Sequence, residues 1–295
     1  MTKKNSGDKV QLIEKFLFKI AKKWIAGDTI DDALSSAKNA YQTGRHVIIN
    51  KLGEYHTTKK QVRNSIDDYQ KIANSFRKWK IRGAISVKPT QIGLSISQKQ
   101  CHKSLEEIIQ KMRHAHVFIW LDMESSEHTD ETIELYSSFF SKYERLGIAL
   151  QANLKRTEDD LNHLLGIGAK IRLVKGAYRE KPSISFKTKE DVDKNYIRLM
   201  TILFKKGNEF AIASHDNNII KKAKTLSKKY PKKFEFEFLK GIREEIKPEL
   251  IKKGFVVSDY IPYGTNWLAY SIRRIKERKR NILLLGSSLI QSQRV

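Results

Sequence analysis

The chain has 295 residues, of which 40% are hydrophobic and 31% charged, with a formal net charge of +24 and a single cysteine, Cys101. No apolar run approaches the roughly 20 residues that cross a bilayer, and no apolar segment follows the basic N-terminus, so we expect neither a membrane-spanning helix nor an export signal. One cysteine excludes a disulfide framework, and no His or Cys spacing is typical of a zinc site, so we expect no metal and a location in the reducing cytoplasm.

Residues 1–45 are predicted to form a helical arm. Apolar residues recur at helical spacing between Leu12 and Trp24. A second helix is expected after Asp28, because Thr29 and Asp32 stand in the positions of a capping box, with an apolar stripe behind them.

Beyond residue 45, short apolar runs alternate with longer amphipathic ones. The expected strands are His46–Asn50, Ala84–Lys88, Val117–Asp122, Gly147–Gln151, Lys170–Val174, Phe210–Ser214, Lys233–Phe238 and Phe255–Tyr260. The expected helices are Lys59–Trp79, Ser104–His114, Thr129–Leu146, Thr157–Ile167, Lys187–Lys206, Asn218–Lys229, Pro248–Lys253 and Trp267–Arg278. This alternation is typical of parallel βαβ units, and its eight repeats favour a closed (βα)8 TIM barrel over an open doubly wound sheet. We therefore predict one domain, with the arm over 1–45 and the barrel over 46–295.

Polar residues lie at the carboxyl ends of most expected strands, where TIM barrels have their active sites. They are Lys88, Asp122, Gln151, Lys175, the run Ser214–Asp216 and Tyr260, with Arg172 inside the fifth strand. A helix cap or a loop ion pair explains any one of them, but so many at one end of the strands predict a functional site.

The predicted site is mostly cationic, with Lys88, Arg172, Lys175 and, on the last helix, Arg273 and Arg274. Such side chains suit an anionic ligand such as a carboxylate or a phosphate. Glu277 follows Arg273 by four residues and is placed to hold the arginine pair. The alternative is an ordinary exposed Arg/Glu helix surface, which Tyr270 on the same helix face argues against.

The excess of positive charge has three interpretations. Basic runs at 221–224 and 228–233 fall on predicted helices and turns, without the interleaved aromatic residues of a single-strand platform. A lysine-rich solvated surface is the simplest interpretation. Attraction to anionic lipid headgroups is the second, and nucleic-acid binding is the third.

Several segments resemble the proline dehydrogenase family, in the order in which they occur there. The strongest are Ile171–Tyr178 (IRLVKGAY), Phe234–Gly241 (FEFEFLKG) and Tyr260–Arg278 (YIPYGTNWLAYSIRRIKER), supported by Ser86–Gly93, Leu121–Glu124, Gln151–Leu161 and Ala213–Asp216. The similarity extends from about Gly27 to Leu285. It is greatest to the short monofunctional bacterial members.

The resemblance implies a distorted TIM barrel that binds FAD noncovalently. The implied reaction oxidises L-proline to Δ1-pyrroline-5-carboxylate by hydride transfer from C5 to flavin N5, the first step of proline catabolism to glutamate. Electrons are expected to pass to a quinone-type acceptor, with peripheral contact to the inner face of the membrane as a further expectation. We expect no second catalytic domain after Val295, and therefore a separate pyrroline-5-carboxylate dehydrogenase downstream.

The resemblance also implies roles for individual residues. Asp122 and Arg172 are the expected catalytic residues, with Arg172 near flavin N5. The expected substrate-binding residues are Lys88, Tyr178, Leu239, Tyr260, Arg273 and Arg274. The expected flavin-binding residues are Met123, Gln151, Arg172, Val174, Lys175, Gly176, Ala177, Ser214, His215 and Glu277. Tyr260 is implied to crowd the ring position that carries the hydroxyl of hydroxyproline, so we expect a preference for proline.

Three residues depart from the family pattern. Glu237 stands where glutamine is common, Lys240 where an aromatic residue or histidine is usual, and Asn153 where tyrosine is frequent. Glu54 is retained, and we expect it to pair with Arg273. A different enzyme class remains as an alternative, a Schiff-base lyase on a TIM barrel in which Lys88 or Lys175 forms the imine. That alternative leaves the arginine pair unexplained.

Overall fold

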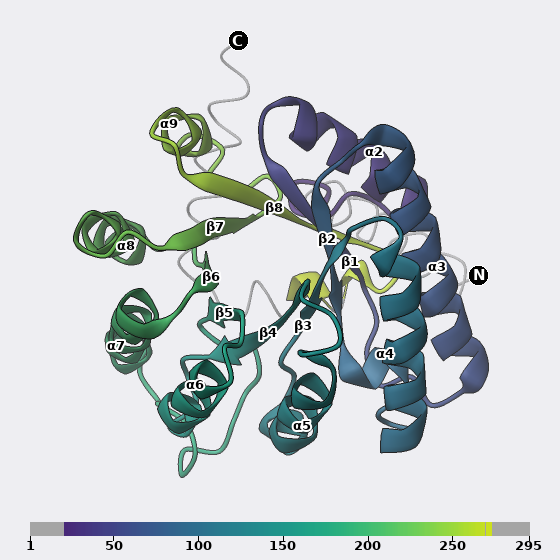
Figure 1. Cartoon of the computed structure of the whole chain (residues 1–295), viewed down its shortest axis with the longest axis horizontal. Coiled ribbons are helices and arrows are strands. Elements are labelled where there is room, and N and C mark those ends of the chain that lie inside the picture. Colours follow the sequence, from purple (N-terminus) through teal and green to yellow (C-terminus); the bar gives the residue numbers. More distant parts are fainter. Residues whose placement is uncertain (1–20, 269, 273–295) are drawn as a thin grey trace, which may run out of the picture.

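The structure is a computed structural model that describes residues 21–268 and 270–272. Its centre is a closed barrel of parallel strands in the order β1 to β8, which confirms the predicted TIM barrel. The strands are β1 (His46–Lys51), β2 (Gly83–Val87), β3 (Phe118–Leu121), β4 (Leu146–Gln151), β5 (Ile171–Val174), β6 (Glu209–Ala213), β7 (Lys233–Leu239) and β8 (Val256–Tyr263). Figure 1 shows the helices arranged around these strands.

The helices alternate with the strands along the chain. They are α2 (Ile30–Gln42), α3 (Lys59–Trp79), α4 (Gln98–Arg113), α5 (Thr129–Phe139), α6 (Thr157–Gly166), α7 (Lys189–Lys206), α8 (Asn217–Lys229) and α9 (Lys247–Lys252), with 3-10 turns η1 (Pro89–Ile92) and η2 (Ser126–His128). The predicted capping box of Thr29 and Asp32 is present at the start of α2. Thr58 and Gln61 form a second capping box at the start of α3.

Three predicted element ends differ from the structure by three residues or more. The helix α4 begins at Gln98, before the predicted start at Ser104, because the Ser97 hydroxyl accepts from the Gln100 amide and caps the helix there. The helix α5 ends at Phe139 and does not continue to Leu146, because the chain turns before β4 and the Arg145 carbonyl accepts a hydrogen bond from the Ile119 amide of β3 at 2.8 Å. The strand β8 continues beyond Tyr260 to Tyr263. Pro262 is tolerated there because it needs no amide partner, while its carbonyl accepts from the Ala26 amide at 2.8 Å.

The predicted N-terminal arm is described only in part. The helix α2 packs against β1 and β8. Most of the helix expected between Leu12 and Trp24 lies outside the described residues, and the boundary at residue 45 stays a prediction. The helix expected from Trp267 is present at 267–268 and 270–272, and its continuation lies outside the described residues.

Side chains along each strand alternate between the surrounding helices and the barrel interior. Those that face the helices form the main apolar core. A smaller cluster of Ile48, Ala84, Trp120 and Ala211 lies within the barrel. Trp120 has room there because its neighbour in the sheet is Gly147, where a Cβ atom would lie 2.3 Å from Trp120 Cζ3. The interior therefore has an apolar part, next to which the polar side chains of the inner face gather.

Candidate active site

Asp122, directly after β3, is the centre of a hydrogen-bonded cluster inside the barrel. Its Oδ1 accepts hydrogen bonds from Ser86 Oγ at 2.6 Å and from Arg172 Nη1 at 3.0 Å. Its Oδ2 accepts from the Tyr260 hydroxyl at 3.0 Å and lies 3.4 Å from Lys88 Nζ. Side chains from β2, β3, β5 and β8 thus converge on one carboxylate. The structure brings together four residues that the sequence placed in the site: Lys88, Asp122, Arg172 and Tyr260.

The protonation states of this cluster follow from its surroundings. Burial alone would raise the pKa of Asp122, but the charges of Lys88 and Arg172 and the hydrogen bonds it accepts outweigh burial and hold the pKa below its usual value. Burial and the nearby Asp122 charge raise the pKa of Tyr260 well above its usual value. At neutral pH the cluster therefore contains an ionised carboxylate and a neutral phenol that donates to it.

Arg172 is held on several sides within the barrel, with 2% of its surface exposed. Its guanidinium carbon lies 4.5 Å from the centre of the Trp120 ring and 5.5 Å from that of Tyr260. Nη1 also donates to Ser86 Oγ at 2.9 Å, and Nε lies 2.7 Å from Glu237 Oε2. Nη2 is buried and has no partner among the described residues. An unsatisfied buried donor of this kind is costly, so it is suited to a ligand atom.

Several contacts of the cluster were not predicted from the sequence. Ser86, Trp120 and Glu237 contact Asp122 or Arg172, and Asn50 Oδ1 accepts from Lys88 Nζ at 3.4 Å. Trp120 belongs to the apolar cluster within the barrel and also stacks on the guanidinium. The signal that could have found these residues is the two-residue period of the strands, which puts them on the same inner face as Arg172 and Tyr260.

Lys175, expected to bind the flavin, lies in an ion-pair cluster after β5. It pairs with Asp193 on α7 and lies 3.2 Å from Asp216. Lys189 pairs with the same two aspartates but is more exposed, with 54% of its side chain accessible against 29% for Lys175. A phosphate bound by Lys175 would therefore share this cation with two carboxylates.

Other residues predicted to bind the flavin have clear structural partners. His215 Nε2 accepts from the Leu239 amide at 2.9 Å, which ties the end of β6 to the end of β7. Gln151 Nε2 donates to the Glu124 carbonyl at 2.8 Å, and Met123 lies in the main core. Val174, Ala177 and Ser214 are partly or fully buried, and Ser214 Oγ accepts from the Asp216 amide at 3.3 Å.

Gly176 requires glycine on two grounds. Its φ of +106° is in the left-handed region, and a Cβ atom at this position would lie 2.0 Å from Asn153 Oδ1. Asn153 Oδ1 is itself buried and has no hydrogen-bond partner among the described residues. The glycine backbone after β5 therefore lies against an unsatisfied polar atom of the segment after β4.

Tyr178 links this segment to the opposite side of the barrel mouth. Its hydroxyl donates to Glu54 Oε2, after β1, at 2.9 Å. Three predicted site residues, Arg273, Arg274 and Glu277, lie outside the described residues, and so does the expected pairing of Arg273 with Glu54. Tyr270 on the same helix is buried, as expected.

The described residues fit a flavin nucleotide better than a metal ion. Arg172 Nη2 and Asn153 Oδ1 are buried and unsatisfied, and Lys88 and Lys175 supply positive charge for an anionic group. Within residues 21–268 and 270–272, no three His, Cys, Asp or Glu side chains are grouped to hold a metal. In the same part of the chain, no helix has the length and apolar character needed to span a membrane.

Comparison with known protein families gives one match over most of the chain. The model of the family described as proline dehydrogenase matches residues 33–282. Proline dehydrogenase 1 of Bacillus subtilis (strain 168) is 33% identical over 274 residues, which cover 92% of this chain and 91% of that protein. Proline dehydrogenase of Deinococcus radiodurans is 30% identical over 289 residues, covering 95% of this chain and 93% of the relative.

Solved structures show the same barrel within longer proteins. Proline utilization A from Bdellovibrio bacteriovorus, inactivated by N-propargylglycine, superimposes with a TM-score of 0.84 at 25% identity. The alignment covers 93% of this chain and 34% of that one, so this chain spans about a third of the longer protein.

Proposed function

Because the chain belongs to the proline dehydrogenase family, we propose that it binds FAD and oxidises L-proline to Δ1-pyrroline-5-carboxylate. The observation that carries this proposal is the convergence of Lys88, Arg172 and Tyr260 on Asp122 inside the barrel. A cationic site with a fixed carboxylate at its centre suits a zwitterionic amino acid. Family membership also argues against the Schiff-base lyase alternative.

In this proposal, the cations of the mouth bind the substrate carboxylate. Lys88 is the described residue for this role, and Arg273 and Arg274 are proposed to complete it. Asp122 is ionised and accepts from Ser86, Arg172 and Tyr260, so it fixes these side chains relative to one another. Rigid placement of the binding groups orients the pyrrolidine ring and lowers the entropic cost of reaction.

The residues proposed to hold FAD are Met123, Gln151, Arg172, Val174, Lys175, Gly176, Ala177, Ser214, His215 and Glu277. Bound at these residues, FAD would supply the two-electron acceptor for the hydride lost from proline C5. Arg172 supplies a permanent positive charge in a site shielded from water, where it stabilises negative charge more strongly than at a surface. Its free Nη2 is the donor that we assign to the cofactor.

Two side chains from the neighbouring strands β8 and β7, Tyr260 and Leu239, are proposed to contact the substrate ring. Tyr260 is fixed by its bond to Asp122 and by its stacking on Arg172. Leu239, whose amide donates to His215, is the apolar counterpart at the end of β7. Tyr178, held by Glu54, is proposed to close the mouth above them.

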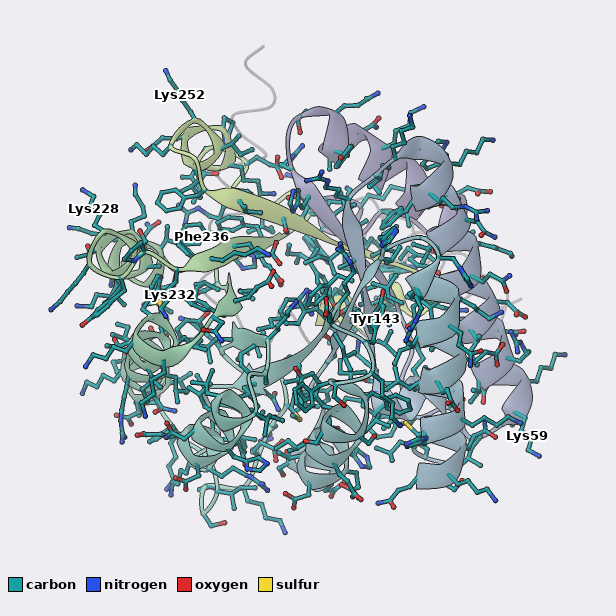
Figure 2. All side chains as sticks on the ribbon, in the orientation of Figure 1. Lys59, Tyr143, Lys228, Lys232, Phe236 and Lys252 are labelled. Carbon is teal, nitrogen blue, oxygen red and sulfur yellow. The ribbon has the colours of Figure 1, made fainter. Side chains whose placement is uncertain are left out.

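The proposed acceptor is a quinone, which requires the protein to approach a membrane. The basic residues of α8, Lys221, Lys222, Lys228 and Lys229, are exposed and supply positive charge for anionic headgroups. Figure 2 shows the side chains of Lys59 and Lys252 extending from different sides of the barrel, so positive charge is not confined to one face. We propose peripheral contact with the membrane separately from the oxidation of proline. We also propose that a separate dehydrogenase consumes the product.

The decisive test is an anaerobic visible spectrum of the purified protein before and after addition of L-proline. We expect flavin absorbance that bleaches with L-proline and not with D-proline. N-Propargylglycine, which inactivates the Bdellovibrio protein, should also abolish turnover of L-proline by this chain. Flavin that stays oxidised with L-proline would refute the substrate, and a protein that neither contains nor takes up FAD would refute the cofactor.

A further inference from the structure

The inner face of β7 carries two carboxyl groups in sequence, Glu235 and Glu237. They are two residues apart on one strand, so both point into the barrel. Glu235 accepts a hydrogen bond from Ser258 Oγ on β8 at 2.5 Å, and Glu237 lies 2.7 Å from Arg172 Nε. Glu237 is as buried as Arg172, with 2% of each side chain exposed.

Arg172 consequently lies between two acidic groups. Asp122 accepts a hydrogen bond from Arg172 Nη1, and the Glu237 carboxyl lies beside Arg172 Nε. With Glu235 next to Glu237, the interior around this guanidinium contains more carboxyl groups than one arginine can neutralise. The cluster contains a second cation, Lys88, but its ammonium group pairs with Asp122.

The second carboxyl oxygen of Glu237 indicates how the excess of carboxyl groups around Arg172 is neutralised. Oε1 is buried, and no donor among the described residues reaches it. Burial, the charge of Glu235 and a hydrogen bond shared with Glu235 together raise the pKa of Glu237 to about 8, against the opposing effect of Arg172. A proton held between the two carboxyl groups satisfies Oε1 and removes one negative charge.

We propose that Glu237 is a positioning residue whose proton, shared with Glu235, sets how much of the Arg172 charge acts on ligands in the barrel mouth. When Glu237 is protonated, Asp122 is the one ionised partner of Arg172. When the proton is lost, Arg172 lies between two carboxylates, and the interior becomes more negative. Anionic ligands of the mouth then bind more weakly. The consequence for proline rests on the proposed function, whereas the shared proton does not.

The groups that face Glu237 come from every neighbouring element. Arg172 approaches from β5 and itself contacts Asp122 and Tyr260, while the sheet neighbours of Glu237 are the non-titrating Ala213 on β6 and Ser258 on β8. The charge of Glu237 contributes to the raised pKa of Tyr196 on α7, but the Tyr196 hydroxyl donates its hydrogen bond to the Leu173 carbonyl. The pKa values of Tyr196 and Tyr260 are raised well above their usual value and that of Asp122 is lowered, so Glu237 is the group expected to titrate near neutral pH.

The first test is the pH dependence of unfolding of the full chain without added ligand, for wild type and Glu237→Gln. A carboxyl whose pKa is higher in the folded state stabilises the fold most at pH values below its unfolded pKa of about 4.3. This contribution is lost as the pH rises toward about 8. Relative to Glu237→Gln, the unfolding constant of the wild type should rise by up to about tenfold per pH unit in this window.

Matched variants separate the shared proton from the loss of any carboxylate. Glu134→Gln removes an exposed glutamate on α5 and should leave the wild-type pH profile intact. Glu235→Gln gives Glu237 an amide donor in place of a carboxyl, so the step should move to lower pH. If Glu237→Gln does not fold, an infrared titration of the wild type should still show a protonated carboxyl that Glu235→Gln alters.

The second test measures the Michaelis constant for L-proline between pH 6 and 9.5. We expect affinity to fall with rising pH in the wild type and to depend less on pH in Glu237→Gln. Identical pH profiles of unfolding for wild type and Glu237→Gln would overturn the shared proton. A stability step without any turnover of proline would instead keep the shared proton and refute the proposed function.

Discussion

The hydroxyl of Tyr260 donates to Asp122 Oδ2 at 3.0 Å, although 138 residues separate the two in the chain. Tyr260 lies within β8 and Asp122 follows β3, and these strands are not neighbours in the sheet. Their contact exists because the sheet closes and the inner faces of distant strands meet. Arg172, which donates to the same carboxylate from β5, completes a contact between three separated parts of the barrel.

Asp122→Asn is predicted to lower kcat/KM for L-proline by about 10²- to 10³-fold, the range seen when one preorganised electrostatic contact is removed from an active site. The amide keeps the shape of the side chain but removes the charge that orders Lys88 and Arg172. Glu237 lies against Arg172 and should ionise more readily once Asp122 is neutral, so the unfolding free energy should fall by less than the about 3–5 kcal/mol of a broken buried pair. Steady-state kinetics and chemical unfolding measure the two effects.

The matched control is Asp130→Asn, which removes an exposed carboxylate paired with Arg156 outside the barrel. It should leave both quantities close to wild type. Equal activity of Asp122→Asn and Asp130→Asn would show that Asp122 does not organise the site.

The barrel could be predicted from the sequence because its signals are local. The α3 helix has a capping box at Thr58 and Gln61 and ends at Lys80 in the left-handed region, so its apolar stripe and its ends agree. The helix α5 was predicted too long, because the residues up to Leu146 also suit a helix. What fixes its end is the pairing of β4 with β3, a contact between segments that periodicity does not detect.

The sequence predicted several of the residues that form the site, but it did not predict which of them contact one another. Alternation along strands indicates that Ser86, Arg172 and Glu237 face inward, but it does not say which of them meet. Glu237 was recognised only as a departure from the family pattern. Its position against Arg172 depends on how β5 and β7 are placed across the barrel, which closure of the whole sheet determines.

Gly147→Ala is predicted to displace Trp120 and, through it, Arg172 of the site. The added Cβ atom would lie 2.3 Å from Trp120 Cζ3, and Trp120 packs on Arg172 with 4.5 Å from guanidinium carbon to ring centre. Overpacking of this kind costs about 1–3 kcal/mol of unfolding free energy. We also expect lower activity with L-proline, because Arg172 must shift with the indole.

Gly166→Ala is the control for this substitution. Gly166 ends α6, and nothing lies within 4 Å of a Cβ atom built there. Its unfolding free energy should change by no more than about 0.5–1 kcal/mol, in either direction. If thermal unfolding shows the two variants to be equally stable, Trp120 is not held in place by Gly147.

Tyr260 is predicted to set the preference for proline over trans-4-hydroxy-L-proline. Tyr260→Phe keeps the ring, which stacks on Arg172, and loses the bond to Asp122, so it should lower turnover while keeping the preference. Tyr260→Ala removes the ring and should narrow the ratio of kcat/KM values for the two substrates. Equal turnover of both substrates by the wild type would contradict this role.

Lys175→Met is predicted to weaken FAD binding with little effect on the fold. Lys175 lies after β5 beside Asp193 and Asp216, and we propose that it also contacts the phosphate part of the cofactor. A charge-assisted hydrogen bond contributes about 1.5–3 kcal/mol, which corresponds to a loss of about 10- to 100-fold in affinity. Lys189→Met is the matched control, because Lys189 pairs with the same two aspartates from a more exposed position on α7. Titration of the flavin-free proteins with FAD should show weak binding for Lys175→Met and wild-type binding for Lys189→Met. Equal loss in both variants would mean that the aspartates need either lysine as a counter-charge and that Lys175 does not contact the cofactor.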